Sequence, residues 1–195
     1  MISLRVTTLF LGLSLLLATV PARAEDDKFR SINDITEALN PLDVIANHDG
    51  IKRSIDLNIQ FQLDSFALLP AAQRQIKALA GAINSDRLNG YGIQIVGHTD
   101  AQGNSDHNQW LSEQRATAVL LSLGLDYGVM RSRLNSFGEG ESQLIEGYAE
   151  DDARHRRVEI IAVPMSTLDT KPSDEVERSS DNDVENLTGK KNIEW

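Results

Sequence analysis

The sequence predicts an α/β fold in which a mixed sheet of four strands carries helices packed on one face. In some segments apolar and polar residues alternate, which is typical of strands that bury one side. In others apolar residues recur every three or four positions, which is typical of amphipathic helices. These segments follow one another in the order βαβαββ, and such alternation favours a two-layer sandwich. The chain has 195 residues, 41% of them hydrophobic, enough for one modest core.

The first βα unit is expected at residues 55–83. The apolar positions that alternate with polar ones in its strand are Ile55, Leu57, Ile59 and Phe61. Pro70 suits the first position of the helix, where its missing N–H is not needed. The apolar stripe of that helix consists of Ala72, Ile76, Leu79, Ala80 and Ile83. Asn89-Gly90 then breaks the chain, and a second strand is expected around residues 93–99.

A longer helix is expected from Ser105 to Leu123, with Gly124 as its stop. A short third strand follows at residues 133–137, and the glycines just after it indicate a turn. The last strand is expected at residues 156–163, where apolar residues again alternate, and Pro164 ends it. Residues 51–164 therefore form the predicted domain.

The first 24 residues have the pattern of a cleavable signal peptide. A short charged segment precedes an apolar run from Val6 to Val20, and small residues precede the expected cleavage after Ala24. That run is shorter than the roughly 20 residues that span a bilayer, and the alternative is an uncleaved anchor. We expect the protein to be exported from the cytoplasm.

The segments on either side of the domain differ in character. Residues 25–50 are expected to form a linker or a short helix, because Ile32, Ile35 and Leu39 lie at helical spacing before Pro41. Residues 165–195 are rich in acidic and polar residues and are expected to form a disordered acidic tail that folding does not need. Either segment is a candidate contact for envelope or outer-membrane proteins.

Charge and cysteine content exclude several classes of function. The formal net charge of −10 opposes binding to nucleic acid, whose phosphates require a basic surface, and opposes adsorption on anionic lipid. Cysteine is absent, which excludes disulfides, thiolate catalysis and lipid attachment through a cysteine.

The most informative segment is residues 98–116, HTDAQGNSDHNQWLSEQRA. Asp100 follows an apolar strand, and Arg115 lies fifteen positions later on the expected helix. A carboxylate accepts hydrogen bonds from an ammonium group, and arginine pairs with a carboxylate. The two side chains at one end of a βα unit therefore suit a zwitterionic ligand. The pattern alone leaves a second interpretation open, an internal salt bridge between Asp100 and Arg115.

This segment resembles the peptidoglycan-binding motif of the OmpA C-terminal-like family, TDxxGxxxxNxxLSxxRA. Residues 155–160, HRRVEI, resemble the NRRVEI strand that closes the family's domain. The resemblance covers residues 53–163 and implies an OmpA-like sandwich. It also implies a stand-alone periplasmic protein that binds peptidoglycan without covalent chemistry and is not an enzyme. It also implies that Asp100 and Arg115 hold the diaminopimelate side chain of the stem peptide, by its ammonium and its carboxylate respectively.

Five further residues are candidates for this site. The first arginine of the NRR motif corresponds to Arg156, and strand alternation sends Arg156 and Arg157 to opposite sides, so at most one faces the pocket. Asp64 lies in a turn that resembles the family's FDS turn, and it either touches the ligand or caps a helix. The others are Thr99 and Asn108, expected to orient the Asp100 loop, and Leu111, expected in the core or the pocket floor.

Two departures from the family pattern keep another class of function open. The family asparagine is His155 here, and Asp151-Asp152 replace a Gly-Arg pair. The alternative is a periplasmic protein-interaction module with an OmpA-like fold and a degenerate glycan pocket.

Metal binding and catalysis are weaker interpretations. Asp100, Gln102, Asn104 and Asp106 alternate as in a calcium loop, but Ser105 stands at the glycine position and Leu111 at the closing glutamate. Ser112 lies in no GxSxG elbow. We therefore expect no metal, no cofactor and no catalytic residue.

Overall fold

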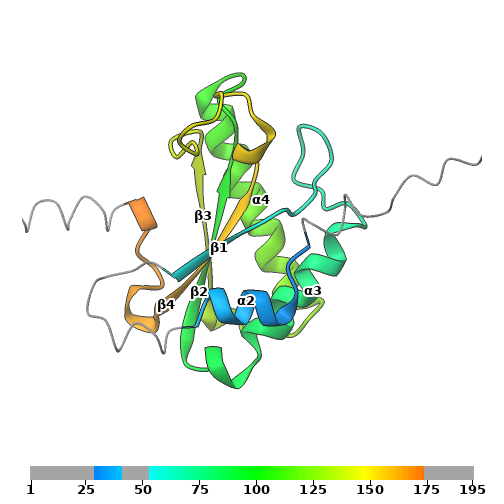
Figure 1. Ribbon diagram of the computed structural model, residues 1–195, viewed down its shortest axis with the longest axis vertical. Coiled ribbons are helices and arrows are strands. Elements are labelled where there is room, and N and C mark those ends of the chain that lie inside the picture. Colours follow the sequence, from blue (N-terminus) through cyan, green and yellow to red (C-terminus); the bar gives the residue numbers. More distant parts are fainter. Residues whose placement is uncertain (1–28, 41–52, 174–195) are drawn as a thin grey trace, which may run out of the picture.

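The computed structural model describes residues 29–40 and 53–173. A four-stranded sheet in the order β1-β4-β2-β3 forms its centre (Figure 1). β4 lies between β1 and β2 and is antiparallel to both, whereas β2 and β3 are parallel. The predicted mixed sheet is therefore confirmed. The strands are β1 (Arg53–Leu57), β2 (Tyr91–His98), β3 (Leu134–Gly140) and β4 (Val158–Pro164).

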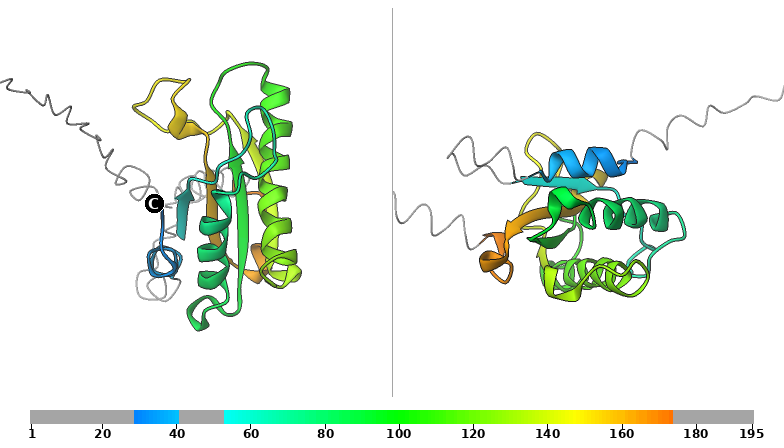
Figure 2. Two further views of the ribbon diagram at one scale, coloured as in Figure 1. Left: turned by 90° about the vertical axis from the view of Figure 1, so that its right-hand side faces the viewer. Right: turned by 90° about the horizontal axis from the view of Figure 1, so that it is seen from below.

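Helices α3 (Ala72–Ile83) and α4 (Ser105–Leu125) connect the strands in the predicted order βαβαββ and pack on one face of the sheet (Figure 2). α2 (Ile32–Ala38) precedes this unit and packs beside α3 and β1. Ser31 and Asp34 form a reciprocal capping box at its start, which satisfies backbone N–H groups that the first turn leaves unpaired. Within the described part of the chain, no helix is long and apolar enough to cross a membrane.

The core lies between the helices and the sheet. Alternation along the strands places Ile93 and Ile95 of β2 and Ile160 of β4 on the helix-facing side, where all three are fully buried. The same core contains buried apolar residues from all three helices: Ile35, Ile76, Leu79, Ile83, Ala116, Val119 and Leu123. The apolar residues of the strands and those of the helices therefore pack together in one layer.

Several expected boundaries are wrong. β3 continues to Gly140, through the glycines expected to form a turn, and β4 begins at Val158 and includes Pro164. β1 ends at Leu57 rather than Phe61, and Phe61 instead forms an isolated bridge with Leu68 in the following loop. α3 begins at Ala72, two residues after Pro70. α4 continues through Gly124, because the left-handed glycine that lets the chain turn back is Gly128, with φ of 67°.

The segment after β4 packs on the sheet. The sequence instead predicts a disordered tail from residue 165. Leu168 is only 6% exposed and joins Val96, Ile161 and Val163 on the face away from the helices. The Gln94 side-chain amide donates to the backbone carbonyls of Thr167, Leu168 and Thr170. The expected start of the tail is thus wrong, because this face carries apolar residues that need cover. Residues 174–195 and the expected signal peptide lie outside the described residues.

Leu168→Ala is expected to lower the free energy of unfolding by about 2 kcal/mol, because it removes a buried side chain that fills the surface next to Gly92. Urea unfolding measures the change. A chain ending at Met165 should lose at least as much, whereas one ending at residue 173 should keep full stability. A Leu168→Ala protein as stable as the wild type would show that this segment does not contribute to folding.

Candidate ligand-binding site

Asp100 lies in the loop between β2 and α4, and the backbone fixes this loop at both ends. Thr99 N–H donates to the carbonyl of Gly140, and Ala101 N–H donates to the carbonyl of Glu150. The Asn104 side chain accepts from His107 N–H and starts α4. Asp100 is therefore held at the carboxyl end of β2 with its side chain only 11% exposed.

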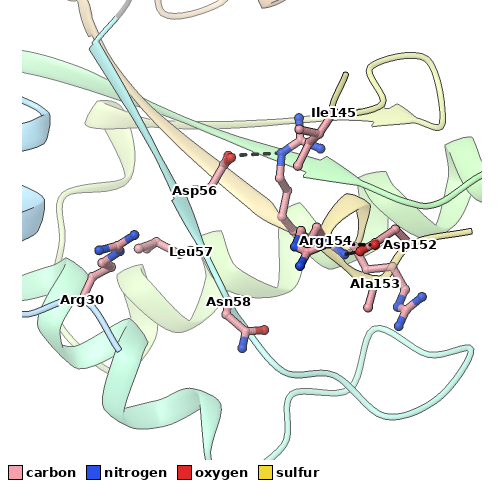
Figure 3. Close-up of a pocket in the computed structure, with 10 residues that line it drawn as sticks. Arg30, Asp56, Leu57, Asn58, Ile145, Asp152, Ala153 and Arg154 are labelled. Carbon is pink, nitrogen blue, oxygen red and sulfur yellow. Dashed lines mark hydrogen bonds and ion pairs between the residues drawn. The ribbon is translucent and has the colours of Figure 1, made fainter. Parts of the chain in front are cut away.

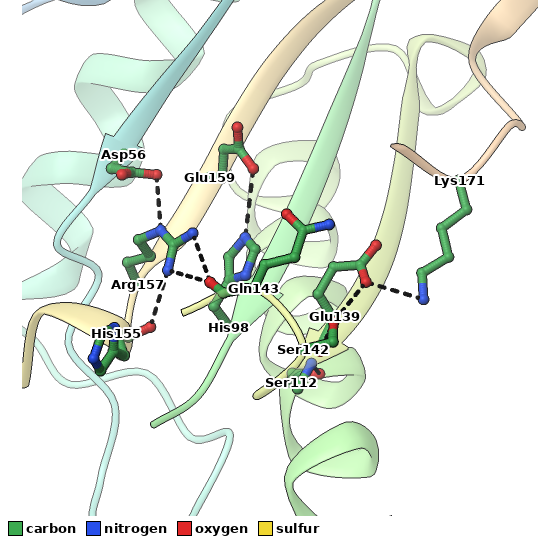
Figure 4. Close-up of polar contacts among 11 residues, drawn as sticks. Asp56, His98, Ser112, Glu139, Ser142, Gln143, His155, Arg157, Glu159 and Lys171 are labelled. Atoms are coloured by element: carbon green, nitrogen blue, oxygen red, sulfur yellow. Dashed lines mark hydrogen bonds and ion pairs between the residues drawn. The ribbon is translucent and has the colours of Figure 1, made fainter. Parts of the chain in front are cut away.

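The partner of Asp100 is Arg156, not Arg115. Arg156 Nη1 lies 2.5 Å from Asp100 Oδ2, so the internal salt bridge that the local pattern left open does not form. Arg157 instead donates to Asp56 and to the carbonyl of Gln143 (Figure 4). Arg156 is therefore the one of this pair that contacts Asp100, but both arginines line the same pocket, so the expectation that at most one of them faces it is wrong.

Arg115 is held in place by the loop that follows β1. Its Nε donates to the carbonyl of Ser65 at 3.0 Å, and its guanidinium lies 5.2 Å from the centre of the Phe61 ring. Burial, and next the nearby charge of Arg156, lower the pKa of Arg115 from its usual value, but an arginine remains charged at neutral pH. The terminal nitrogens form no hydrogen bond with the described residues, so the fork can bind a ligand.

Arg115 and Arg156 line one pocket of about 370 Å³ together with Arg157. Ile59, Phe61 and Leu69 contribute apolar walls, whereas Asp100 does not line the pocket and is joined to it through its contact with Arg156. The pocket therefore offers three arginines and an apolar lining, with one carboxylate next to it. Such a set can bind a carboxylate and an ammonium group that belong to the same ligand.

Asn108 orients the Asp100 loop, as expected. Its side-chain nitrogen lies 3.3 Å from the carbonyl oxygen of Asp100, 3.0 Å from that of Gln102 and 2.7 Å from Glu141 Oε2. Thr99 contributes through its backbone, while its buried hydroxyl has no hydrogen-bond partner among the described residues. Leu111 is buried but does not line the pocket.

Asn108→Ala is expected to lower the free energy of unfolding by about 1–2 kcal/mol, because it leaves buried carbonyl oxygens of the loop without a donor. The same change should weaken ligand binding through Asp100, whose position it loosens. Thermal unfolding and binding to cell-wall sacculi measure the two effects. Unchanged stability together with unchanged binding would show that Asn108 does not orient the loop.

Asp64 lies at the rim of the site and caps no helix. It sits in a tight loop with a positive φ of 48°, and its Oδ1 lies 2.8 Å from Nε2 of His107 on α4. Phe66 packs edge-on against Trp110 one turn further along α4. These contacts, together with the Arg115–Ser65 hydrogen bond, dock the loop on α4. The sequence gives no signal for His107 or the Ser65 carbonyl in this role.

His155 replaces the family asparagine and supports the loop before β4. It is fully buried, its Nδ1 accepts from Ile145 N–H at 3.1 Å, and its Nε2 lies 2.8 Å from the Ala149 carbonyl. These contacts require the neutral ring with the proton on Nε2. The histidine thus fixes the chain directly before Arg156. Only its place in the motif could have indicated this role.

A model described as OmpA family matches residues 60–157. The chain belongs to the OmpA family. It is 36% identical over 107 residues to outer membrane porin F of Pseudomonas aeruginosa, covering 54% of this chain and 30% of that protein. It is 32% identical over 124 residues to the probable lipoprotein YiaD of Escherichia coli, covering 63% of this chain and 55% of that one. The chain thus spans only about a third to a half of these OmpA-family relatives.

A solved structure shares the fold. The periplasmic domain of Helicobacter pylori MotB has a TM-score of 0.50 and 21% sequence identity, and the similarity covers 69% of this chain and 87% of that one. The mixed four-stranded α/β architecture of this OmpA-family chain is therefore that of known OmpA-like domains.

Proposed function

We propose that this OmpA-family protein binds peptidoglycan without covalent chemistry, through the diaminopimelate of the stem peptide, in the Gram-negative cell envelope. The observation that carries the proposal is that Arg115 and Arg156 line one pocket and that Arg156 pairs with Asp100 beside it. The end of a diaminopimelate side chain carries an ammonium and a carboxylate group on one carbon. Asp100 and Arg115 carry the charges opposite to these two groups.

Each residue has a distinct role in this proposal. Arg115 binds the ligand carboxylate with its free fork, which Ser65 and Phe61 hold in position before the ligand arrives. Asp100 accepts from the ligand ammonium and shares its carboxylate with Arg156. Because Asp100 and Arg115 are partly buried, these charged contacts act in a medium less polar than water and are stronger than on an open surface.

The names of the relatives support the cellular location. One relative is an outer membrane porin and another a probable lipoprotein, which favours the cell envelope. The export pattern of residues 1–24 points to the periplasmic side. We propose that the protein acts there by binding alone and not as an enzyme.

The proposal is tested by comparing sacculi that differ in one chemical group. Sacculi with diaminopimelate should retain the protein, whereas sacculi with lysine at that position should bind it about tenfold more weakly or less. Lysine keeps the ammonium group but lacks the carboxylate that Arg115 is proposed to hold. Pull-down at low salt measures retention. Equal retention on both types would contradict recognition of diaminopimelate.

A protein-interaction module is the second candidate. The observation that favours it is that Asp152, which pairs with Arg154 at 2.9 Å, replaces an arginine of the family pattern. No retention on either type of sacculus at low salt would support this candidate.

A further inference from the structure

We infer that a second pocket, next to the first, binds another carboxylate of the same stem peptide; this inference rests on the proposed function. The second pocket has a volume of about 690 Å³. It lies where the end of β1 meets the loop before β4 (Figure 3). The charged side chains that line it are Arg30, Arg154, Arg156, Arg157, Asp56 and Asp152.

The two pockets form one continuous groove. They share Asn58, Ala153, Arg156 and Arg157 as lining residues. Arg156 stands between them, with its side chain 48% exposed. Because the two pockets share lining residues, a peptide whose diaminopimelate fills the first pocket can extend its neighbouring groups into the second.

The second pocket is cationic on a strongly acidic protein. Four arginines and two aspartates line it, whereas the whole chain has a net charge of −10. Arg157 is fully engaged by Asp56 and by the carbonyls of Gln143 and His155. Arg154 and Arg30 are therefore the cations that can reach a ligand. The Arg154 side chain pairs with Asp152 but remains 59% exposed.

Arg30 reaches this pocket because the segment before α2 is anchored on α3. The Arg30 N–H donates to Gln75 Oε1 at 2.9 Å, and Gln75 Nε2 donates to the Arg30 carbonyl at 3.0 Å. The guanidinium takes no part in this anchor. Arg30 also lies outside residues 60–157, which match the family model. Arg30 therefore adds a cation to this pocket from outside the residues that match the family model.

The ligand chemistry follows from the lining. Arg30 and Arg154 suit a carboxylate, and the apolar lining residues Leu57, Ile145 and Ala153 suit small alkyl side chains such as that of alanine. A stem peptide of alanine, γ-linked glutamate and diaminopimelate carries two such carboxylates. One is the α-carboxylate of the glutamyl residue and the other is the C-terminal carboxylate.

Calorimetric titration of the full chain with four ligands tests the inference. The ligands are free meso-diaminopimelate, the Ala-γ-Glu-diaminopimelate tripeptide, the tripeptide with an amide on its glutamyl α-carboxyl, and the tripeptide with an amide at its C-terminus. One of the two amides should weaken tripeptide binding about tenfold, and that amide identifies the carboxylate that the second pocket holds. If it is the glutamyl carboxylate, the tripeptide should also bind about tenfold more tightly than free diaminopimelate, which lacks that group.

Variants assign the effect to the second pocket. Arg30→Ala and Arg154→Ala should each weaken tripeptide binding about three- to fivefold, the size expected for an exposed charge pair. Asp152→Asn keeps an oxygen that can accept from Arg154 N–H but removes a repelling charge, so it should tighten tripeptide binding. The control is Arg87→Ala, which removes an exposed arginine from the turn before β2 and should change nothing.

Two failures are distinguishable. If free diaminopimelate does not bind, the proposed function is wrong, and the inference falls with it. If free diaminopimelate binds, two results would show that the second pocket holds no carboxylate. One is that both amides bind as tightly as the parent tripeptide. The other is that both arginine variants bind the tripeptide as tightly as the wild type does.

Discussion

Replacing Asp100 with alanine is expected to weaken binding to diaminopimelate-type sacculi about ten- to hundredfold. The change removes the acceptor for the ligand ammonium, a charge-assisted contact of about 1.5–3 kcal/mol. It also leaves Arg156 without the carboxylate that holds it at 2.5 Å, so one cation of the pocket loses its position. Pull-down with increasing sacculus concentration measures the loss.

Arg115→Ala should produce a loss of similar size through the ligand carboxylate. Arg115→Lys keeps the charge but lacks the fork that donates to Ser65 and to the ligand together, so it should recover only part of the binding. The double variant of Asp100 and Arg115 should lose less than the sum of the single losses, because the two residues hold groups on the same carbon of one ligand.

Stability measurements separate binding from folding in these variants. Arg115→Ala removes the hydrogen bond to Ser65 and should cost about 1 kcal/mol, which leaves most molecules folded. Binding is therefore compared per folded molecule, with Arg87→Ala as the charge-matched control. Wild-type binding in both Asp100→Ala and Arg115→Ala would overturn the assignment of the site.

Gly97→Ala is expected to be the most destabilising single change in the sheet, with a loss of about 3 kcal/mol or more. At Gly97, β2 passes directly under α4, and an added Cβ would collide with the backbone carbonyl of Ser112. Backbone atoms cannot rotate away as a flexible side chain can, so the helix must shift. Because α4 also carries Arg115, such a shift should weaken ligand binding too. Urea unfolding measures the stability.

The matched control is the same substitution at Gly124. Gly124 lies inside α4, and the nearest atom to an added Cβ, the carbonyl oxygen of Val129, is 3.8 Å away. Alanine should therefore raise stability by about 0.5–1 kcal/mol, because it favours the helix more than glycine does. A Gly97→Ala protein as stable as the wild type would contradict the close approach of β2 and α4.

The local patterns in the sequence correctly predict the elements of this fold. Alternation in β2 and β4 and the helical stripe of α3 depend only on neighbouring residues, because strand and helix periods place side chains on one face whatever lies opposite. Asp100 follows β2 as expected, but Arg115 lies in the middle of α4 rather than at the end of the βα unit that Asp100 occupies. The prediction fails at Phe61, where the alternating pattern continues but the chain leaves the sheet.

By itself, the sequence determined the order of the elements, their buried faces and the charged residues near the site. Only the tertiary structure decided the partners. Asp100 pairs with Arg156, 56 positions away, Arg115 is held by a backbone carbonyl 50 positions away, and Leu168 covers the far face of the sheet. The period of apolar residues along the sequence indicates which side of a helix or strand is apolar. Which charges meet depends on how distant segments are placed, and that placement follows from packing the whole core.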